Sequence, residues 1–334
     1  MKRLLIGLLG AAALGLVPMA EAQAQTQAPQ VLRLSSSFAP QGYIADAMNF
    51  FAAEVHKRSQ GRLKIEIYFN SSLGFKNTVT LSSMKKGLVD LSEWMGGNVD
   101  GELPMAGVLN LPFLHPDYDK GIKWQIERLT PELNKETNKR WDVTILAAVG
   151  LPAPTEFFSN KPFKTLKDLQ DVKIRSWGGM LGDSLYYIGA KPYTITTSEL
   201  YTALQRGMVN ASITSVISAT ETRFWEVLKY VNHITMSTNQ NTLGIRNEVL
   251  KKLSPDLQAA VIDSGKALTQ WGLDNYKPNA AKLLKVLTDN GMQEVWPEPG
   301  EVEKMRDKCK PLYDKFIAEL SPESLPLLKD LGIY

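Results

Sequence analysis

Arg175 is the residue with the clearest chemical capability, and it lies in the stretch Asp171-Val-Lys-Ile-Arg-Ser-Trp-Gly-Gly. Val172 to Ser176 has the pattern of a short strand, which places the arginine at the carboxyl end, just before a turn and a helix. Ligands of open α/β sheets bind outside these ends, and a guanidinium is a permanently charged planar fork that matches a carboxylate. Arg175 is therefore a candidate carboxylate-binding residue. The alternative is a surface arginine paired with a structural Asp or Glu.

Further candidate binding residues cluster near the ends of other predicted strands. They are Phe38, Trp94, Asn98, Thr155, Glu156, Trp177, Thr197 and Thr214. Trp94 and Trp177 each lie beside a glycine pair, which lets the backbone approach a ligand while the aromatic ring walls a pocket. Both tryptophans are equally well explained as core residues beside plain turns.

No residue pattern in the chain predicts catalysis. The sequence has no Gly-x-Ser-x-Gly, His-Glu-x-x-His, Walker or Gly-x-Gly-x-x-Gly motif. His56, His115 and His233 are scattered without metal-ligand spacing. Cys309, the single cysteine, stands in a charged helical context, where we expect a surface thiol. We therefore expect a binding protein rather than an enzyme, with no cofactor and no metal site of its own. The sequence leaves open whether a metal ion bridges ligand and protein.

The N-terminus has the pattern of a secretory signal peptide. Lys2 and Arg3 precede an apolar run and small-x-small cleavage options, so we expect residues 1–24 to be removed on export. No cysteine follows for a lipid anchor, and no later segment reaches the roughly 18 apolar residues of a membrane span. A net charge of +3 over 334 residues is too small to indicate the basic surface that nucleic-acid binding requires. These features predict a free periplasmic protein, which we expect to be a monomer.

Strands alternate with helices along the chain, which predicts parallel sheets and an α/β fold. The pattern restarts near Gly150-Leu-Pro-Ala-Pro154, where we expect the chain to cross into a second lobe. A helical pattern starts at Ser254-Pro255-Asp256 and runs to Asn290. Some 35 residues would span roughly 50 Å, so this helix should contact both lobes, with a kink near Pro278.

The expected organisation is a two-lobe periplasmic binding protein fold with a long inter-lobe helix and a ligand cleft between the lobes. Lobe I comprises residues 30–153 plus about 240–277. Lobe II comprises residues 154–239 plus about 278–334, which end in two closing helices.

The chain resembles the solute-binding proteins of tripartite ATP-independent periplasmic (TRAP) transporters, the DctP family. The most specific matching segments are Leu169-Gln-Asp-Val-Lys-Ile-Arg, Ser198-Glu-Leu-Tyr-Thr-Ala-Leu-Gln-Arg-Gly-Met-Val-Asn and Phe224-Trp-Glu-Val-Leu-Lys-Tyr. The resemblance implies two α/β lobes that clamp an organic acid and deliver it to a permease with a small and a large membrane subunit. Transport is then driven by a sodium or proton gradient. The principal carboxylate-binding arginine of the family falls on Arg175.

Two positions depart from the family pattern. A second family arginine aligns with Thr155, beside Glu156, and a family asparagine aligns with Thr214. One guanidinium neutralises one carboxylate, and a second buried anionic group would remain unpaired at a cost of several kcal/mol. We therefore expect a monocarboxylate, such as a hydroxy, keto or aromatic acid, rather than a dicarboxylate or sialic acid. A binding protein of an ATP-driven importer and a ligand-sensing partner of a membrane receptor remain the alternatives.

Overall fold

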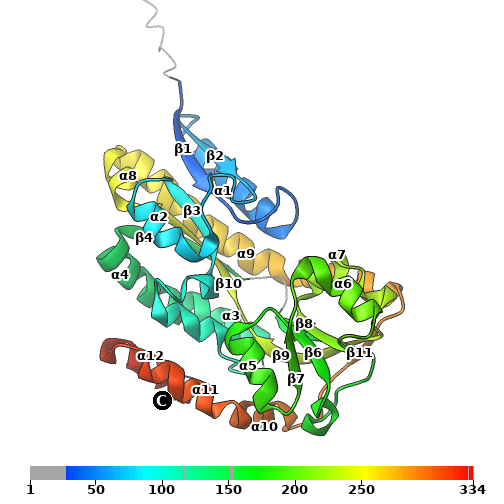
Figure 1. Ribbon diagram of the computed structural model, residues 1–334. Coiled ribbons are helices and arrows are strands. Elements are labelled where there is room, and N and C mark those ends of the chain that lie inside the picture. The colour runs from blue at the N-terminus through cyan, green and yellow to red at the C-terminus, as the bar shows by residue number, and fades with distance from the viewer. Residues whose placement is uncertain (1–27, 116, 151–153, 330, 334) are drawn as a thin grey trace, which may run out of the picture.

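The computed structural model describes residues 28–115, 117–150, 154–329 and 331–333. Two β-sheets, each flanked by helices, form two lobes that lie side by side (Figure 1). Among these residues, no helix is both long and apolar enough to cross a membrane. The α/β fold expected from the sequence is confirmed.

Lobe I is built on a five-stranded sheet. Its strands, in spatial order, are β2 (Leu63–Tyr68), β1 (Gln30–Ser35), β3 (Leu91–Met95), β10 (Gln240–Arg246) and β4 (Val143–Gly150). β10 runs antiparallel to both neighbours, while β1 is parallel to β2 and β3. One face packs against α1 (Tyr43–Arg58) and the first part of α9 (Pro255–Asp289), and the other against α2 (Thr80–Lys85) and α4 (Thr130–Trp141). The remaining helices are η1 (Asn77–Val79), η2 (Gly96–Val99), η3 (Pro104–Asn110), α3 (Tyr118–Trp124) and α8 (Asn247–Lys252).

Lobe II is built on a six-stranded sheet. Its strands, in spatial order, are β11 (Gln293–Val295), β9 (Tyr230–Ser237), β5 (Thr155–Ser159), β8 (Ala211–Thr214), β6 (Lys173–Ser176) and β7 (Lys191–Thr194). One face carries α6 (Thr197–Gln205), α7 (Val216–Glu221) and the last part of α9. The opposite face packs against α5 (Gly179–Tyr187) and α10 (Glu301–Lys308). Two 3₁₀ turns, η5 (Leu166–Leu169) and η6 (Phe224–Glu226), complete this lobe.

Three connections join the lobes. β4 is followed by β5 in the other sheet, and β9 returns to β10 through only two residues, Thr238 and Asn239. α9 packs on α1 and β4 in lobe I and on α7 in lobe II, as Figure 1 shows. The expected long helix is therefore confirmed, and it is unbroken through Pro278. The exact division of the chain between the lobes stays a prediction.

The C-terminal helices contact both lobes. They are α10, α11 (Lys310–Ala318), η7 (Pro322–Ser324) and α12 (Leu325–Lys329). α10 packs on η5 of lobe II. The Tyr313 hydroxyl in α11 donates a hydrogen bond to the carbonyl of Pro112 in lobe I. Residues after about 300 therefore brace the two lobes along the side opposite α9 (Figure 1).

The Thr130-Pro131 pair has the sequence pattern of an N-cap followed by a first-turn proline, which predicts two separate helices after Leu114. The structure has one continuous helix there, so this prediction is wrong. The π-helical segment η4 (Gln125–Leu129) joins α3 to α4, and Thr130 has helical backbone angles rather than those of an N-cap. Pro131 lacks the N–H that would bond to Glu127. The backbone N–H and the hydroxyl of Thr130 both donate to the carbonyl of Gln125 instead, so the wider turn accommodates the proline within the helix.

Gly265 is expected to be essential for the packing of α9 on β4. A Cβ at this position would overlap the carbonyl oxygen of Leu146, which is backbone and cannot rotate away. Gly265→Ala should lower the free energy of unfolding by about 2 kcal/mol, because this overlap outweighs the roughly 1 kcal/mol that alanine gains in a helix. Urea denaturation measures the change. Gly101→Ala, where a Cβ would meet no atom within 4 Å, is the control, and equal stability of the two variants would contradict the packing argument.

Candidate functional site

Strand register brings three of the predicted binding residues together on one face of the lobe II sheet. Arg175 in β6 pairs with Ser212 in β8, and Thr214, two residues further along β8, pairs with Glu156 in β5. Because side chains two residues apart in a strand share a face, Arg175, Thr214 and Glu156 are close neighbours. All three side chains are buried, and Arg175 is only 3% exposed.

Arg175 is held rigidly at the end of its strand. Its Nε donates a hydrogen bond of 2.8 Å to the carbonyl of Ile195, which fixes the plane of the guanidinium. Burial lowers the pKa of Arg175, yet an arginine keeps its charge in a protein. A buried cation of this kind is stabilised by an anionic partner. The position is therefore suited to hold a carboxylate.

Trp177 extends the same site towards solvent. Its ring lies 5.9 Å from the guanidinium carbon of Arg175, within range of a cation–π interaction. The side chain is 48% exposed, which is unusual for tryptophan. The core explanation for Trp177 is therefore wrong, and the ring remains available to cover a ligand.

Glu156 belongs to a group of three charged or titratable side chains on neighbouring strands, with His233 and Glu294, which the sequence analysis missed. His233 in β9 lies between two carboxylates, with Nδ1 at 2.9 Å from Glu156 and Nε2 at 2.9 Å from Glu294 in β11. The Trp296 ring packs against the imidazole, with centroids 4.7 Å apart. Burial lowers the pKa of His233, but the hydrogen bonds and charges of Glu156 and Glu294 outweigh it, so the net pKa is raised. The two carboxylates therefore favour the protonated form of His233.

On lobe I, a second buried carboxylate was also missed. Glu93 in β3 is 2% exposed, and its Oε2 accepts hydrogen bonds from the Ser36 hydroxyl at 2.7 Å and the Ser37 amide at 3.2 Å. Burial raises the pKa of Glu93 to about 7, against the lowering effect of these hydrogen bonds. The available signal was an acidic residue within the apolar strand pattern of residues 88–93.

The structure separates Trp94 from this polar cluster. The apolar pattern of residues 88–93 predicts a strand that ends at Glu93. The observed strand starts later, at Leu91, because Gly87 has a left-handed φ of 79° and the chain needs three more residues after this turn. Trp94 is therefore inside the strand, on the opposite face from Glu93, 1% exposed and packed in the core against Gly244. This placement favours the core explanation for Trp94.

The other predicted residues occupy the rims of the two sheets. Asn98 is exposed after β3, Phe38 is half-buried after β1, and Thr155 is half-buried opposite Ser237. Thr197 begins α6, and its side chain lies outside the described part of the structure. The surface thiol expected at Cys309 is wrong. This side chain is buried between α10 and α11, and burial raises its pKa to about 12.

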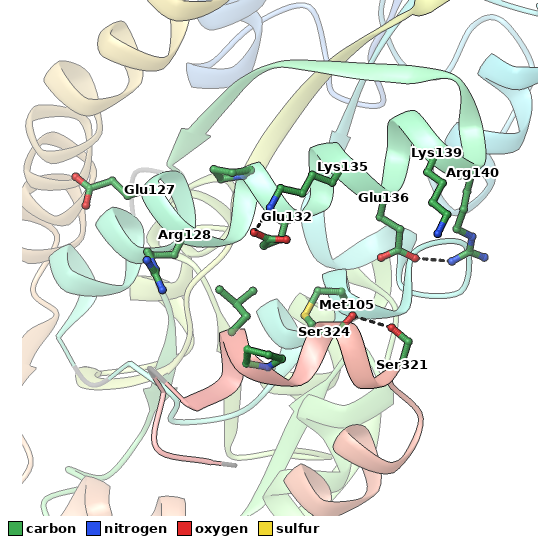
Figure 2. A pocket seen from close by; sticks show the side chains of 13 residues that line it. Met105, Glu127, Arg128, Glu132, Lys135, Glu136, Lys139, Arg140, Ser321 and Ser324 are labelled. Atoms are coloured by element: carbon green, nitrogen blue, oxygen red, sulfur yellow. Dashed lines mark hydrogen bonds and ion pairs between the residues drawn. The ribbon is translucent and has the colours of Figure 1, made fainter.

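A separate groove lies between α4 and the C-terminal segment (Figure 2), with a volume of about 660 Å³. None of the predicted binding residues lines it. Two of its cations pair with carboxylates on the same helix, Lys135 with Glu132 at 2.7 Å and Arg140 with Glu136 at 2.5 Å. These pairs reduce the positive charge available to an anionic ligand. Among the described residues, no group of three His, Cys, Asp or Glu side chains could hold a metal ion.

Comparisons with known proteins define the family. The profile of the bacterial extracellular solute-binding proteins, family 7 (DctP), matches residues 34–320. The chain belongs to this family of TRAP-type solute-binding proteins. A solute-binding protein of Albidiferax ferrireducens is 28% identical over 320 residues, which cover 92% of this chain and 91% of that one.

Solved structures share the fold. A TRAP periplasmic solute-binding protein from Ochrobactrum anthropi, with a C-terminus bound in its ligand pocket, superposes with a TM-score of 0.84 at 22% identity, covering 91% of this chain and 95% of that one. DctP7 of Bordetella pertussis, a receptor binding pyroglutamic acid, gives a TM-score of 0.78 at 20% identity, with 91% and 99% covered. At this level of identity the likeness shows the two-lobe fold.

The raised pKa of His233 predicts how stability depends on pH. Protonated His233 is more favourable in the folded than in the unfolded protein, so its contribution is fully present below the unfolded pKa of about 6.5 and is lost as pH rises through the folded pKa. His233→Gln should therefore lower the free energy of unfolding more at pH 5.5 than at pH 9. Denaturant titrations at both pH values measure this difference.

The matched control for this experiment is His56→Gln, on the exposed part of α1, which should keep the wild-type profile. A His233→Gln penalty that is constant with pH, or larger at pH 9, would contradict the assignment of a charged His233 between Glu156 and Glu294.

Proposed function

We propose that this protein is a periplasmic receptor that captures a small organic acid through one carboxylate and delivers it to a TRAP-type membrane transporter. The observation that carries the proposal is Arg175, a buried arginine at the carboxyl end of a parallel strand. Its planar fork binds the carboxylate, and Thr214, its neighbour on the sheet face, offers a hydroxyl to the same ligand. Family membership and the leader pattern at residues 1–24 support export and delivery.

The charges around Arg175 favour a ligand with a single carboxylate. Thr155 stands where the family pattern has a second arginine, and the adjacent side chain, Glu156, is itself acidic and buried. His233 is already shared between Glu156 and Glu294. A second carboxylate at this position would face Glu156, and repulsion between buried like charges is unfavourable.

The ligand body we propose is compact and of hydroxy, keto or aromatic type. The half-exposed ring of Trp177 can cover an apolar face of such a molecule next to the cation. The pyroglutamic acid bound by the Bordetella pertussis receptor is a small ring with one carboxylate, which supports this class without identifying the molecule.

A panel of acids tests the ligand class. We expect thermal shift and calorimetry to detect binding of at least one monocarboxylate among pyroglutamate, lactate, pyruvate and benzoate, and no tight binding of succinate. A second carboxylate would bring an unneutralised charge into the site. Tight succinate binding without any monocarboxylate binding would overturn the proposed class.

Arg175→Gln tests whether Arg175 binds the carboxylate of the ligand. The variant keeps a planar polar side chain but loses the charge, so affinity for the acid should fall roughly 100-fold, the equivalent of one or two charge-assisted hydrogen bonds. Arg206→Gln, on the exposed end of α6, is the matched control and should bind normally. Unchanged affinity in a folded Arg175→Gln protein would place the anion site elsewhere.

A further inference from the structure

Glu156 has one carboxylate oxygen that the protein does not use. Its Oε1 lies 2.9 Å from Nδ1 of His233, whereas no donor among the described residues bonds to Oε2. Oε2 is also not one of the enclosed polar atoms that lack a partner, so it is accessible from outside the chain. The side chain as a whole is only 5% exposed. An oxygen in this position is suited to accept a hydrogen bond from a bound molecule.

His233 fixes the orientation of the Glu156 carboxylate. Its two ring nitrogens each lie 2.9 Å from a carboxylate oxygen, one of Glu156 and one of Glu294, and both can donate only when the imidazole is protonated. The Trp296 ring packs against the imidazole and restricts it further. Because the contact with His233 uses Oε1 alone, the carboxylate is held in one orientation while Oε2 is left for another partner.

Strand order brings this oxygen near the proposed carboxylate site. β8 lies between β5, which carries Glu156, and β6, which carries Arg175. Neighbouring strands are about 4.8 Å apart, so these two backbones are about 10 Å apart. Glu156 pairs with Thr214, and Arg175 pairs with Ser212, two residues earlier in β8. The small side chains of Ser212 and Thr214 separate Arg175 from Glu156 on this face, and a small acid can span the distance between the two longer side chains.

Glu156 also lies close to the boundary between the lobes. Tyr118 in α3 belongs to lobe I. Burial is the main cause of the raised pKa of Tyr118, the hydroxyls of Tyr43 and Tyr276 add to it, and the charge of Glu156 contributes as well. Glu156 is therefore near lobe I as well as Thr214, as expected for a residue beside a ligand held between the lobes.

We propose that Glu156 determines ligand specificity, because its Oε2 accepts a hydrogen bond from a hydroxyl or amide N–H group of the acid whose carboxylate lies on Arg175. This inference rests on the proposed function and deepens it, since it names a second group that the ligand carries. His233 is the positioning residue that holds Glu156.

The chemistry of the free oxygen favours a neutral donor. One free acceptor matches the single donor of a hydroxyl or amide N–H, whereas an ammonium group has three donors to satisfy. Protonated His233 already balances the charge of Glu156, so a second cation is not required. A keto acid or an apolar acid offers no donor and would leave Oε2 unpaired. Among the proposed ligands, a hydroxy acid or a cyclic amide acid therefore fits best.

Matched acids test the preference by calorimetry. Benzoate is compared with its monohydroxy derivatives, and butyrate with its monohydroxy derivatives. The corresponding methoxy acids keep the oxygen but lose the donor. Pyroglutamate is compared in the same way with N-methylpyroglutamate and cyclopentanecarboxylate. In at least one series, the wild-type protein should bind a donor-bearing acid at least tenfold more tightly than both its methylated form and its parent acid.

Substitutions then assign this preference to Glu156. Glu156→Gln keeps the shape of the side chain but replaces the charged acceptor by a neutral amide, so the preference should fall at least fivefold. Glu294→Gln is the matched control. It removes the other carboxylate bonded to His233, but it lies in β11, on the far side of β9 from Glu156, so the preference should persist. Circular dichroism and melting temperature verify that both variants are folded.

The outcomes separate this inference from the proposed function. The role of Glu156 would be overturned if no donor-bearing acid were preferred in any series, if the preference survived in folded Glu156→Gln protein, or if Glu294→Gln removed it equally. Each of these results leaves the Arg175 site standing. If no acid binds the wild-type protein, the proposed function fails and this inference fails with it.

Discussion

The burial of the Arg175 guanidinium is the constraint on which the account depends. A desolvated cation is costly unless an anion or a set of acceptors approaches it. The carbonyl of Ile195 satisfies Nε, and the neighbouring acidic side chain, Glu156, is held by His233. We propose that the carboxylate of an organic acid binds at this sheet edge through the planar fork of Arg175. The strand that carries Arg175 lies inside the sheet, between β7 and β8, so the cation cannot move to solvent without disrupting the lobe.

The two lobes bury charged groups of opposite sign. Lobe II buries the permanent positive charge of Arg175, with Thr214 and Trp177 beside it. Lobe I buries the carboxyl group of Glu93, whose pKa burial raises to about 7. The connection between β9 and β10 joins the two sheets, and α9 packs on both lobes.

Much of this arrangement can be predicted from local sequence, and the rest depends on which strands pair. The end of β6 and the length of α9 follow from short stretches of sequence, and the structure contains both. The partnerships of Glu93 with Ser36 and of His233 with Glu156 join residues 57 and 77 positions apart. They arise from the order of strands in the sheets, which the sequence analysis did not derive. β10 in particular returns from lobe II to pair between β3 and β4 of lobe I, far from both in sequence.

The central claim is that Arg175 holds one acid group of a small molecule. Native mass spectrometry of the mature protein, purified without added ligand and then denatured to release what it carries, tests this claim most directly. The account predicts a small acid with a single carboxylate in the wild-type protein and an empty Arg175→Gln protein. A neutral sugar, an amine or a dicarboxylate released from the wild type, or the same acid retained by Arg175→Gln, would contradict it.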